Sequence, residues 1–136
     1  MNAQRIERYE LQREFFGKAL QRLLEALELD ETSIVRDALI QRFEFTFEMA
    51  WKTLFRYLAD RGETMAAKAW DVIPVAFESK LIDDAEVWDR MREYRNDLSH
   101  EYNEAKAIEL SAYIRSHAVG ALVALRDQLA ARPGLR

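Results

Sequence analysis

The chain has 136 residues, enough for one domain with a hydrophobic core of its own. Its hydrophobic residues (49%) and charged residues (32%) are typical of a folded globular protein, and its 4 glycines and 2 prolines are too few for a turn-rich all-β fold. The absence of cysteine excludes disulfides, thiolate metal sites and cysteine nucleophiles. Because the net charge is -4, contact with RNA or DNA would need a local basic patch or a partner's.

The first ten residues are polar and lack the apolar core of a signal peptide, and no apolar run approaches the length of a membrane span. We therefore expect a single domain over residues 1–136, a cytoplasmic location and no membrane partner. The lack of cysteine fits a reducing compartment.

Apolar residues recur every three or four positions along most of the chain, which predicts helices. Taken in order, these helices cover about residues 3–28, 34–60, 83–98 and 103–131, with a shorter one in 65–80. Thr32 or Ser33 can cap the second helix, and Gly62 stands where a left-handed residue ends it. Pro74 either starts a turn or kinks the short helix. The sequence predicts an all-α, antiparallel four-helix bundle with an additional short helix.

Periodicity also predicts which side chains are buried. On the second helix, Glu44, Glu48, Lys52 and Arg56 recur every four residues and form a solvated ridge on which Glu48 supports Lys52. The three tryptophans are expected to be packing residues. The apolar stripe of the last helix is expected to contain Ile108, Ala112, Ile114 or Ala118, Leu122, Leu125 and Leu129.

The sequence lacks the residues that phosphate-binding loops, nucleotidyltransferase sites and metal sites require. The four glycines stand far apart, so there is no glycine-rich loop to hold phosphates, and none is followed by the serine of a polymerase-β-type nucleotidyltransferase. A di-iron bundle would need two Glu-x-x-His pairs, whereas the chain has only Asp97-x-x-His100. With two histidines in all, a histidine-rich zinc site is not expected either.

The segment from Met91 to Tyr102 contains the remaining candidate functional side chains, among them Arg95, His100 and Tyr102. Helical projection places Val87, Trp88, Met91 and Leu98 on an inward face, and Arg95 falls on that same face. A guanidinium cannot be neutralised, so it must meet a carboxylate, a phosphate or water there. A purely structural interpretation is that Arg95 forms an ion pair, for example with Glu44 or Glu48.

His100 follows Arg95 by five residues, about 140° around an ideal helix. The two side chains can share a target if the helix bends or ends within residues 96–99, or if two chains meet along it. A local break is plausible because Asn96, Asp97 and Ser99 compete for backbone hydrogen bonds. An extended residue after His100 would turn Tyr102 to the side of the imidazole.

A fixed cation, an imidazole and a phenol suit RNA cleavage without a metal. His100 can move a proton at the 2′-hydroxyl or at the leaving oxygen, and Arg95 can stabilise the charge on the phosphate. A two-fold dimer would supply one base and one acid. On the alternative interpretation, His100 is a helix cap, and His117 is structural or solvated.

The stretch Arg95-Asn-Asp-Leu-Ser-His100-Glu-Tyr102 resembles the R-x4-H-x-Y motif of the HEPN superfamily, in its HepT-like toxin branch. The stretch Phe43-Glu-Phe-Thr-Phe-Glu-Met-Ala-Trp51-Lys-Thr-Leu54 is similar to the group known as nucleotidyltransferase substrate-binding proteins. The order of elements agrees from about residue 4 to residue 130.

This resemblance implies a HEPN-like bundle that forms a homodimer through the motif helices and acts as a metal-independent ribonuclease toxin. It implies that Arg95 and His100 are catalytic, that Asn96 and Asp97 support them, and that no cofactor is bound. It further implies a minimal nucleotidyltransferase as antitoxin, using its own ATP and Mg²⁺ to transfer AMP to Tyr102; the phosphate ester would repel the RNA substrate. The alternative is a non-catalytic, substrate-binding subunit of a two-component nucleotidyltransferase.

Overall fold

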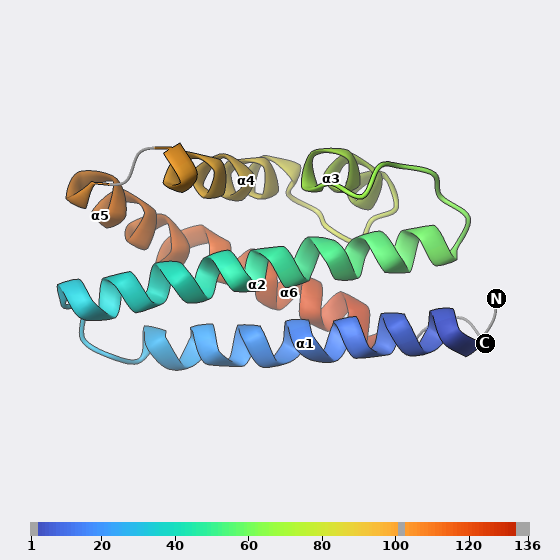
Figure 1. Cartoon of the computed structure of the whole chain (residues 1–136), viewed down its shortest axis with the longest axis horizontal. Coiled ribbons are helices and arrows are strands. Elements are labelled where there is room, and N and C mark those ends of the chain that lie inside the picture. The colour runs from blue at the N-terminus through green and yellow to red at the C-terminus, as the bar shows by residue number, and fades with distance from the viewer. Residues whose placement is uncertain (1–2, 101–102, 133–136) are drawn as a thin grey trace.

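The computed structural model describes residues 3–100 and 103–132, with the side chains of Ser99 and His100 excepted. In these residues the secondary structure is helical, without strands (Figure 1). The elements are α1 (Ala3–Leu27), α2 (Ser33–Asp60), α3 (Ala69–Glu78), α4 (Ala85–His100), α5 (Glu104–Tyr113), the π-helical turn η1 (Ile114–Ala118) and α6 (Val119–Ala130). Because α5, η1 and α6 follow one another without a break, the described part of the chain forms five helices.

Most predicted helix ends are confirmed by capping contacts. The Thr32 hydroxyl accepts a hydrogen bond from the Val35 amide (3.1 Å), and the Asn103 side chain accepts one from Lys106 (2.9 Å). Asp84 accepts one from Val87 (3.1 Å) at the start of α4. Gly62 has a φ of 90°, in the left-handed region that favours glycine.

Helix α3 shows what Pro74 does. The helix begins five residues earlier, at Ala69, and continues past the proline to Glu78, so Pro74 does not start it. The side chain of Pro74 is exposed, while Val72, Ile73 and Ala76 are buried. The short third helix is therefore confirmed, with the proline on its solvent side.

The π turn corrects the apolar stripe predicted for the last helix. Ile108 is 47% exposed and Ala112 is exposed, whereas Ala107, Leu110 and Ile114 are buried. Beyond η1 the expected residues Leu122, Leu125 and Leu129 are buried. A π turn inserts one residue into the helix, so a stripe extended backwards at the α-helical period is displaced before the turn.

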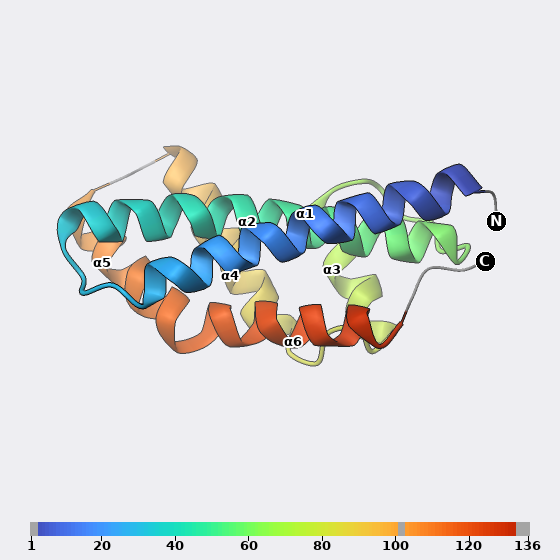
Figure 2. The same cartoon turned by 90° about the horizontal axis from the view of Figure 1, so that it is seen from below.

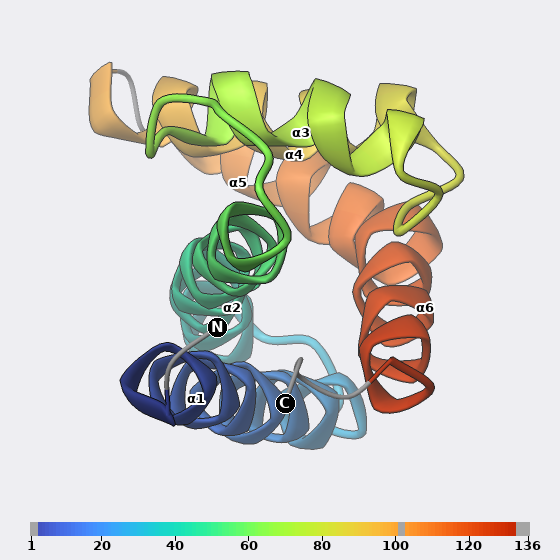
Figure 3. The same ribbon diagram turned by 90° about the vertical axis from the view of Figure 1, so that its right-hand side faces the viewer.

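Helices α1 and α2 form an antiparallel pair on one side of the molecule, and α6 runs along the other side (Figures 1 and 3). Helices α3 and α4 form a layer across them, and α4 runs obliquely relative to α2 rather than antiparallel to it (Figure 2). The arrangement has the expected four long helices and one short helix. Among the described helices, the α1–α2 pair shows the simple antiparallel packing of an ideal bundle.

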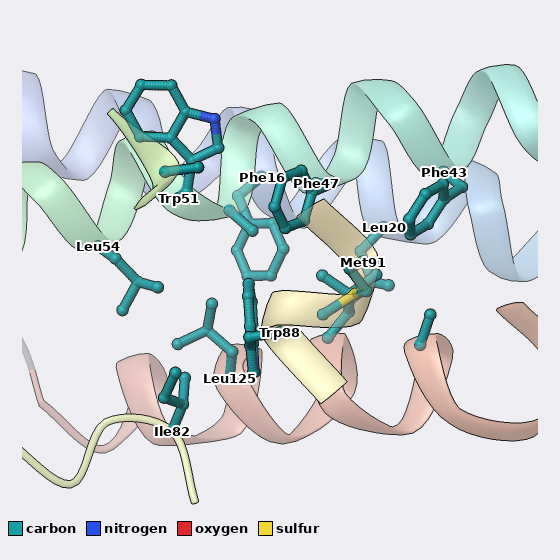
Figure 4. Packing of buried hydrophobic residues seen from close by; sticks show 14 of the residues in the cluster. Phe16, Leu20, Phe43, Phe47, Trp51, Leu54, Ile82, Trp88, Met91 and Leu125 are labelled. Atoms are coloured by element: carbon teal, nitrogen blue, oxygen red, sulfur yellow. The ribbon is translucent and has the colours of Figure 1, made fainter. Parts of the chain in front are cut away.

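The hydrophobic core lies where these layers meet. Trp88 of α4 is 1% exposed and lies near Phe16, Phe47 and Leu125, which come from three other helices (Figure 4). Its ring centroid is 6.1 Å from that of Phe47. Trp51 is also buried, but Trp70 is 64% exposed, so the expectation that all three tryptophans pack in the core is wrong for Trp70. None of the described helices is long and apolar enough to cross a membrane.

Candidate functional site around Arg95

Helix α4 carries the motif, and its inward face is largely the one predicted. Trp88 and Met91 are buried, and Val87 and Leu98 are half-buried against the core. Arg95 lies on the same face, one turn beyond Met91, with 37% of its side chain exposed. The buried side chains of Trp88 and Met91 therefore fix the position of α4, and the guanidinium of Arg95 lies at the edge of the hydrophobic core.

Glu48 of α2 is the partner that Arg95 meets. Arg95 Nη2 lies 2.7 Å from Glu48 Oε2, and the Glu48 side chain is only 22% exposed. The same Oε2 accepts a hydrogen bond from the indole Nε1 of Trp51 (3.1 Å), while Oε1 lies 3.5 Å from Lys52 Nζ. The ion pair considered in the sequence analysis is thus present, and Glu48 holds the guanidinium from a position that Trp51 fixes.

The ridge of α2 is consequently less solvated than predicted. The Glu48–Lys52 contact is confirmed, but Glu44, Glu48, Lys52 and Arg56 are all half-buried. Burial raises the pKa of Glu44, and the positive charge of Arg95 opposes that rise. The two glutamates therefore differ: Glu48 is directly paired with Arg95, and Glu44 is a desolvated carboxyl nearby.

The backbone of α4 excludes one of the two arrangements in which Arg95 and His100 could share a target, a bend or end of the helix within residues 96–99. The helix continues through residues 96–99 and ends at His100, so Arg95 and His100 occupy positions about 140° apart around one helix. The side chain of His100 lies outside the described part of the structure, and so does Tyr102. Within a single chain, helix geometry does not direct the two motif positions towards one point.

Asn96 and Asp97 lie away from the Arg95–Glu48 pair. Asn96 is exposed. Asp97 lines a hollow of about 200 Å³ between α4 and α5. The other side chains of this hollow are Arg90, Tyr94, Leu98, Lys106, Glu109 and Leu110, and the Tyr94 hydroxyl donates to Glu109 at 3.1 Å.

Three side-chain contacts, two of them next to this site, were not predicted from the sequence. Trp51 binds Glu48, a contact signalled only by the three-residue spacing of the pair. Arg92 stacks over the exposed ring of Trp70 at 4.2 Å, joining α4 to α3. His117 stacks on Tyr113 (4.9 Å between centroids) and lines a wide hollow with residues of α4, which places it apart from Arg95. Within the described residues, no group of three or more His, Cys, Asp or Glu side chains could hold a metal ion.

The chain is similar to known proteins both in sequence and in structure. Over 92 residues the chain is 35% identical to the protein named Probable ribonuclease HepT of Haemophilus influenzae. That match covers 62% of this chain and 63% of the relative's own length. A crystal structure of a protein from Thermus thermophilus superposes with a TM-score of 0.69 and 34% identity, covering 86% of this chain and 97% of that one.

The family model for nucleotidyltransferase substrate binding protein like sequences matches residues 6–131, nearly the whole chain. The match spans every helix of the fold, from α1 to α6, including the Arg95–Glu48 pair. The chain belongs to the nucleotidyltransferase substrate binding protein family and is a distant homologue of the protein named Probable ribonuclease HepT.

Proposed function

We propose that this protein is a metal-independent endoribonuclease, the toxin of a pair whose antitoxin is a minimal nucleotidyltransferase. The observation that carries the proposal is the placement of Arg95, a permanently charged and partly exposed group at the edge of the core, in a homologue of a HepT ribonuclease. Its partner Glu48 is an anion that an RNA phosphate can replace, because carboxylate and phosphate oxygens both accept hydrogen bonds from a guanidinium.

In the proposed reaction the 2′-oxygen of RNA bonds to the adjacent phosphorus, and the bond from phosphorus to the 5′-oxygen breaks. His100 of one protomer accepts the proton of the 2′-hydroxyl, and His100 of the second protomer donates a proton to the leaving 5′-oxygen. Arg95 stabilises the charge that develops on the phosphate oxygens. The products are a 2′,3′-cyclic phosphate and a 5′-hydroxyl, and no metal is consumed or required.

The homodimer is part of this proposal. Because α4 is helical through His100, positions 95 and 100 of one chain stand about 140° apart around the helix, and we propose that a two-fold pairing of motif helices brings the Arg95 of one protomer beside the His100 of the other. Asn96 is proposed to contact the RNA from the exposed side of the same helix. Asp97 is proposed to support the helix from the α4–α5 hollow.

The test is cleavage of single-stranded RNA by the purified protein in EDTA, with the product ends identified. We expect cyclic phosphate ends, and at least a hundredfold loss of rate in both His100→Ala and Arg95→Ala. His117→Ala is the matched control, because that imidazole lies on η1, away from Arg95, and should leave the rate unchanged. Equal cleavage by His100→Ala and the original protein would remove His100 from the mechanism.

Regulation is proposed to occur at Tyr102. The tyrosine oxygen would attack the α-phosphorus of ATP held by the partner nucleotidyltransferase, releasing pyrophosphate and leaving AMP as a phosphate ester. Incubation with that partner, ATP and Mg²⁺ should add the mass of AMP to the original protein and to Tyr94→Phe. It should add none to Tyr102→Phe.

A second function, that of a non-catalytic substrate-binding subunit, is favoured by the family's description and by the neutralisation of Arg95 by Glu48. Expression without the partner distinguishes the two. Growth arrest that His100→Ala relieves supports the ribonuclease. Normal growth, with no RNA cleavage but tight association with a nucleotidyltransferase, supports the binding subunit.

A further inference from the structure

Two hollows open along the seam between α1 and α2, at opposite ends of the helix pair. One, of about 480 Å³, is lined by Ala19, Arg22, Ala38, Gln41, Arg42 and Phe45. The other, of about 170 Å³, is lined by Arg5, Arg8, Phe55, Arg56, Ala59 and Asp60. We call the seam with both hollows the α1/α2 groove.

The two hollows lie on the same side of α2. Positions 38, 41 and 42 line the first, and positions 56, 59 and 60 line the second, so each position recurs 18 residues later. Eighteen residues make five turns of an α-helix, which returns a side chain to the same face about 27 Å further along. The two basic hollows therefore lie in line along one face of the α1–α2 pair.

Charge in the groove is almost entirely positive. Five arginines line its hollows, against the single carboxylate of Asp60. Arg22, Arg42 and Arg56 take part in no salt bridge within the described residues, and burial raises the pKa of Asp60 despite the arginines near it. In a chain with a net charge of -4, this is the local basic patch that a polyanion would need.

Exposed aromatic rings accompany the arginines. Phe45 of α2, in the wall of the larger hollow, is 58% exposed, and Phe15, one turn before Ala19 on α1, is 45% exposed. Rings in water next to guanidinium groups suit stacking with unpaired bases, which is tolerant of base identity. A duplex hides these base faces, so the pairing of rings with cations favours a single strand.

The groove shares α2 with the candidate active site, because Glu48 and Lys52 stand between the positions of α2 that line the two hollows. Lys52 follows Glu48 by one turn on α2, and Glu48 holds Arg95. Viewed along α1 and α2, the C-terminal end of α4 projects on the same side of the molecule as this helix pair (Figure 3). A strand lying along α2 can thus reach Arg95 without crossing the molecule.

From these observations we infer that the α1/α2 groove binds single-stranded RNA and guides it to Arg95. The phosphates lie on Arg8, Arg22, Arg42 and Arg56, and unpaired bases stack on Phe15 and Phe45. The inference rests on RNA being the substrate, as proposed above. A second copy of this chain is a poorer occupant, because two-fold pairing of the groove with itself would place arginines opposite arginines.

The test measures binding of a fluorescent twelve-nucleotide RNA with 2′-O-methyl groups, which cannot be cleaved. The triple variant Arg8→Gln, Arg22→Gln and Arg56→Gln retains Arg42, whose side chain bonds to the Arg22 carbonyl and joins the two helices. We expect its Kd to rise at least tenfold and its salt slope to fall by about 2, at roughly 0.7 per lost phosphate contact. The matched control, Lys68→Gln with Lys80→Gln and Arg126→Gln, removes the same charge elsewhere and should keep the original Kd.

A second variant tests the bases. Phe15→Ser with Phe45→Ser should weaken binding of the single strand and leave binding of a duplex of equal length unchanged. Equal Kd values for the triple variant and its control would overturn the inference. So would a triple variant that changes the sedimentation mass, since the groove would then be an interface between copies. Because the RNA is uncleavable, failure of the ribonuclease proposal alone would leave this binding intact.

Discussion

At Glu48 one carboxylate meets three donors from two helices: the guanidinium of Arg95, the indole of Trp51 and the ammonium of Lys52. The neighbouring Glu44 lies one turn earlier and is desolvated without such a direct partner. A paired carboxylate is stabilised in its charged form, whereas a desolvated one is penalised for it. Burial therefore penalises the charged form of Glu44, whereas Glu48 stands in a direct ion pair with Arg95.

Replacing Glu44 by Gln should raise the free energy of unfolding at neutral pH and not at about pH 3. The raised native pKa means that the folded state binds a proton more readily, so the carboxylate costs no stability well below the usual value of 4.5, and its cost grows with pH until it is complete above the native pKa. Urea unfolding at both pH values measures this. A gain of equal size at both pH values would show that desolvation of the charge is not its cause.

Replacing Glu48 by Gln should instead lower the free energy of unfolding at neutral pH, by no more than about 1 kcal/mol, because the ion pair is partly exposed. The same change should tighten binding of uncleavable RNA, since the phosphate no longer competes with a carboxylate for Arg95. Glu14→Gln, on an exposed ion pair of α1, serves as control for the loss of one negative charge. Weaker RNA binding by Glu48→Gln would mean that Glu48 serves to hold Arg95 in place for the phosphate.

Between elements, Glu31 connects the loop after α1 to α5 and η1 at the same end of the bundle. Its carboxylate accepts hydrogen bonds from Ser111 and from the guanidinium groups of Arg36 and Arg115. These bonds, with that of Ser111 first, lower its pKa below the usual 4.5. The α1–α2 loop is thus tied to α5 and η1 by a charged group.

The stability from Glu31 should depend on pH with a predictable sign. Because its native pKa is lowered, the contribution is complete above the usual value of 4.5 and is lost as the pH falls through the native pKa. We expect Glu31→Gln to destabilise the protein at neutral pH and to have little effect at about pH 3. Thermal unfolding over that range measures it; a constant difference between the two proteins would exclude the carboxylate's charge as the cause.

Glycines within the helices offer a further test at this scale. A Cβ added at Gly17 or Gly120 meets no atom within 4 Å, and both residues are helical. Each change to Ala should stabilise the protein by about 0.5–1 kcal/mol, because glycine loses more backbone freedom on folding. Gly62→Ala, at a φ of 90°, should destabilise by about 1 kcal/mol although space is open there too. Denaturant unfolding of the three variants separates backbone conformation from steric space.

For the molecule as a whole, stability depends on the place where the layers converge. Trp88 is buried among residues of α1, α2 and α6, whereas Trp70 of α3 is exposed and contacts Arg92. The same residue type therefore has two different roles. One fills the core, and the other forms a cation–π contact on the surface between α3 and α4.

Trp88→Ala should lower the free energy of unfolding by about 3–5 kcal/mol, through lost burial and the cavity it leaves. Trp70→Ala should cost no more than about 1 kcal/mol, the value of an exposed cation–π contact. Chemical denaturation measures both. Similar losses for the two variants would contradict the layered core described above.

The sequence by itself determined the helices, their caps and the inward face of α4, because these depend on local spacing and on backbone hydrogen bonds near in sequence. Thr32, Asn103, Gly62, Trp88 and Met91 lie as periodicity and capping rules require. The sequence places Arg95 on the inward face, and an ion pair with Glu44 or Glu48 is the alternative to its proposed catalytic role. The family resemblance was readable from the same two stretches and agrees with the family match.

Only the tertiary structure decided which glutamate meets Arg95, which tryptophan stays in solvent, and that the α1/α2 groove gathers five arginines. Each depends on the rotation and crossing angle of helices distant in sequence. The π turn likewise shifts the side chains before it by about 100° relative to a continuous α-helix, because it inserts one residue. A rule that assumes a constant period cannot register such a shift, because the packing of neighbouring helices fixes where the period changes.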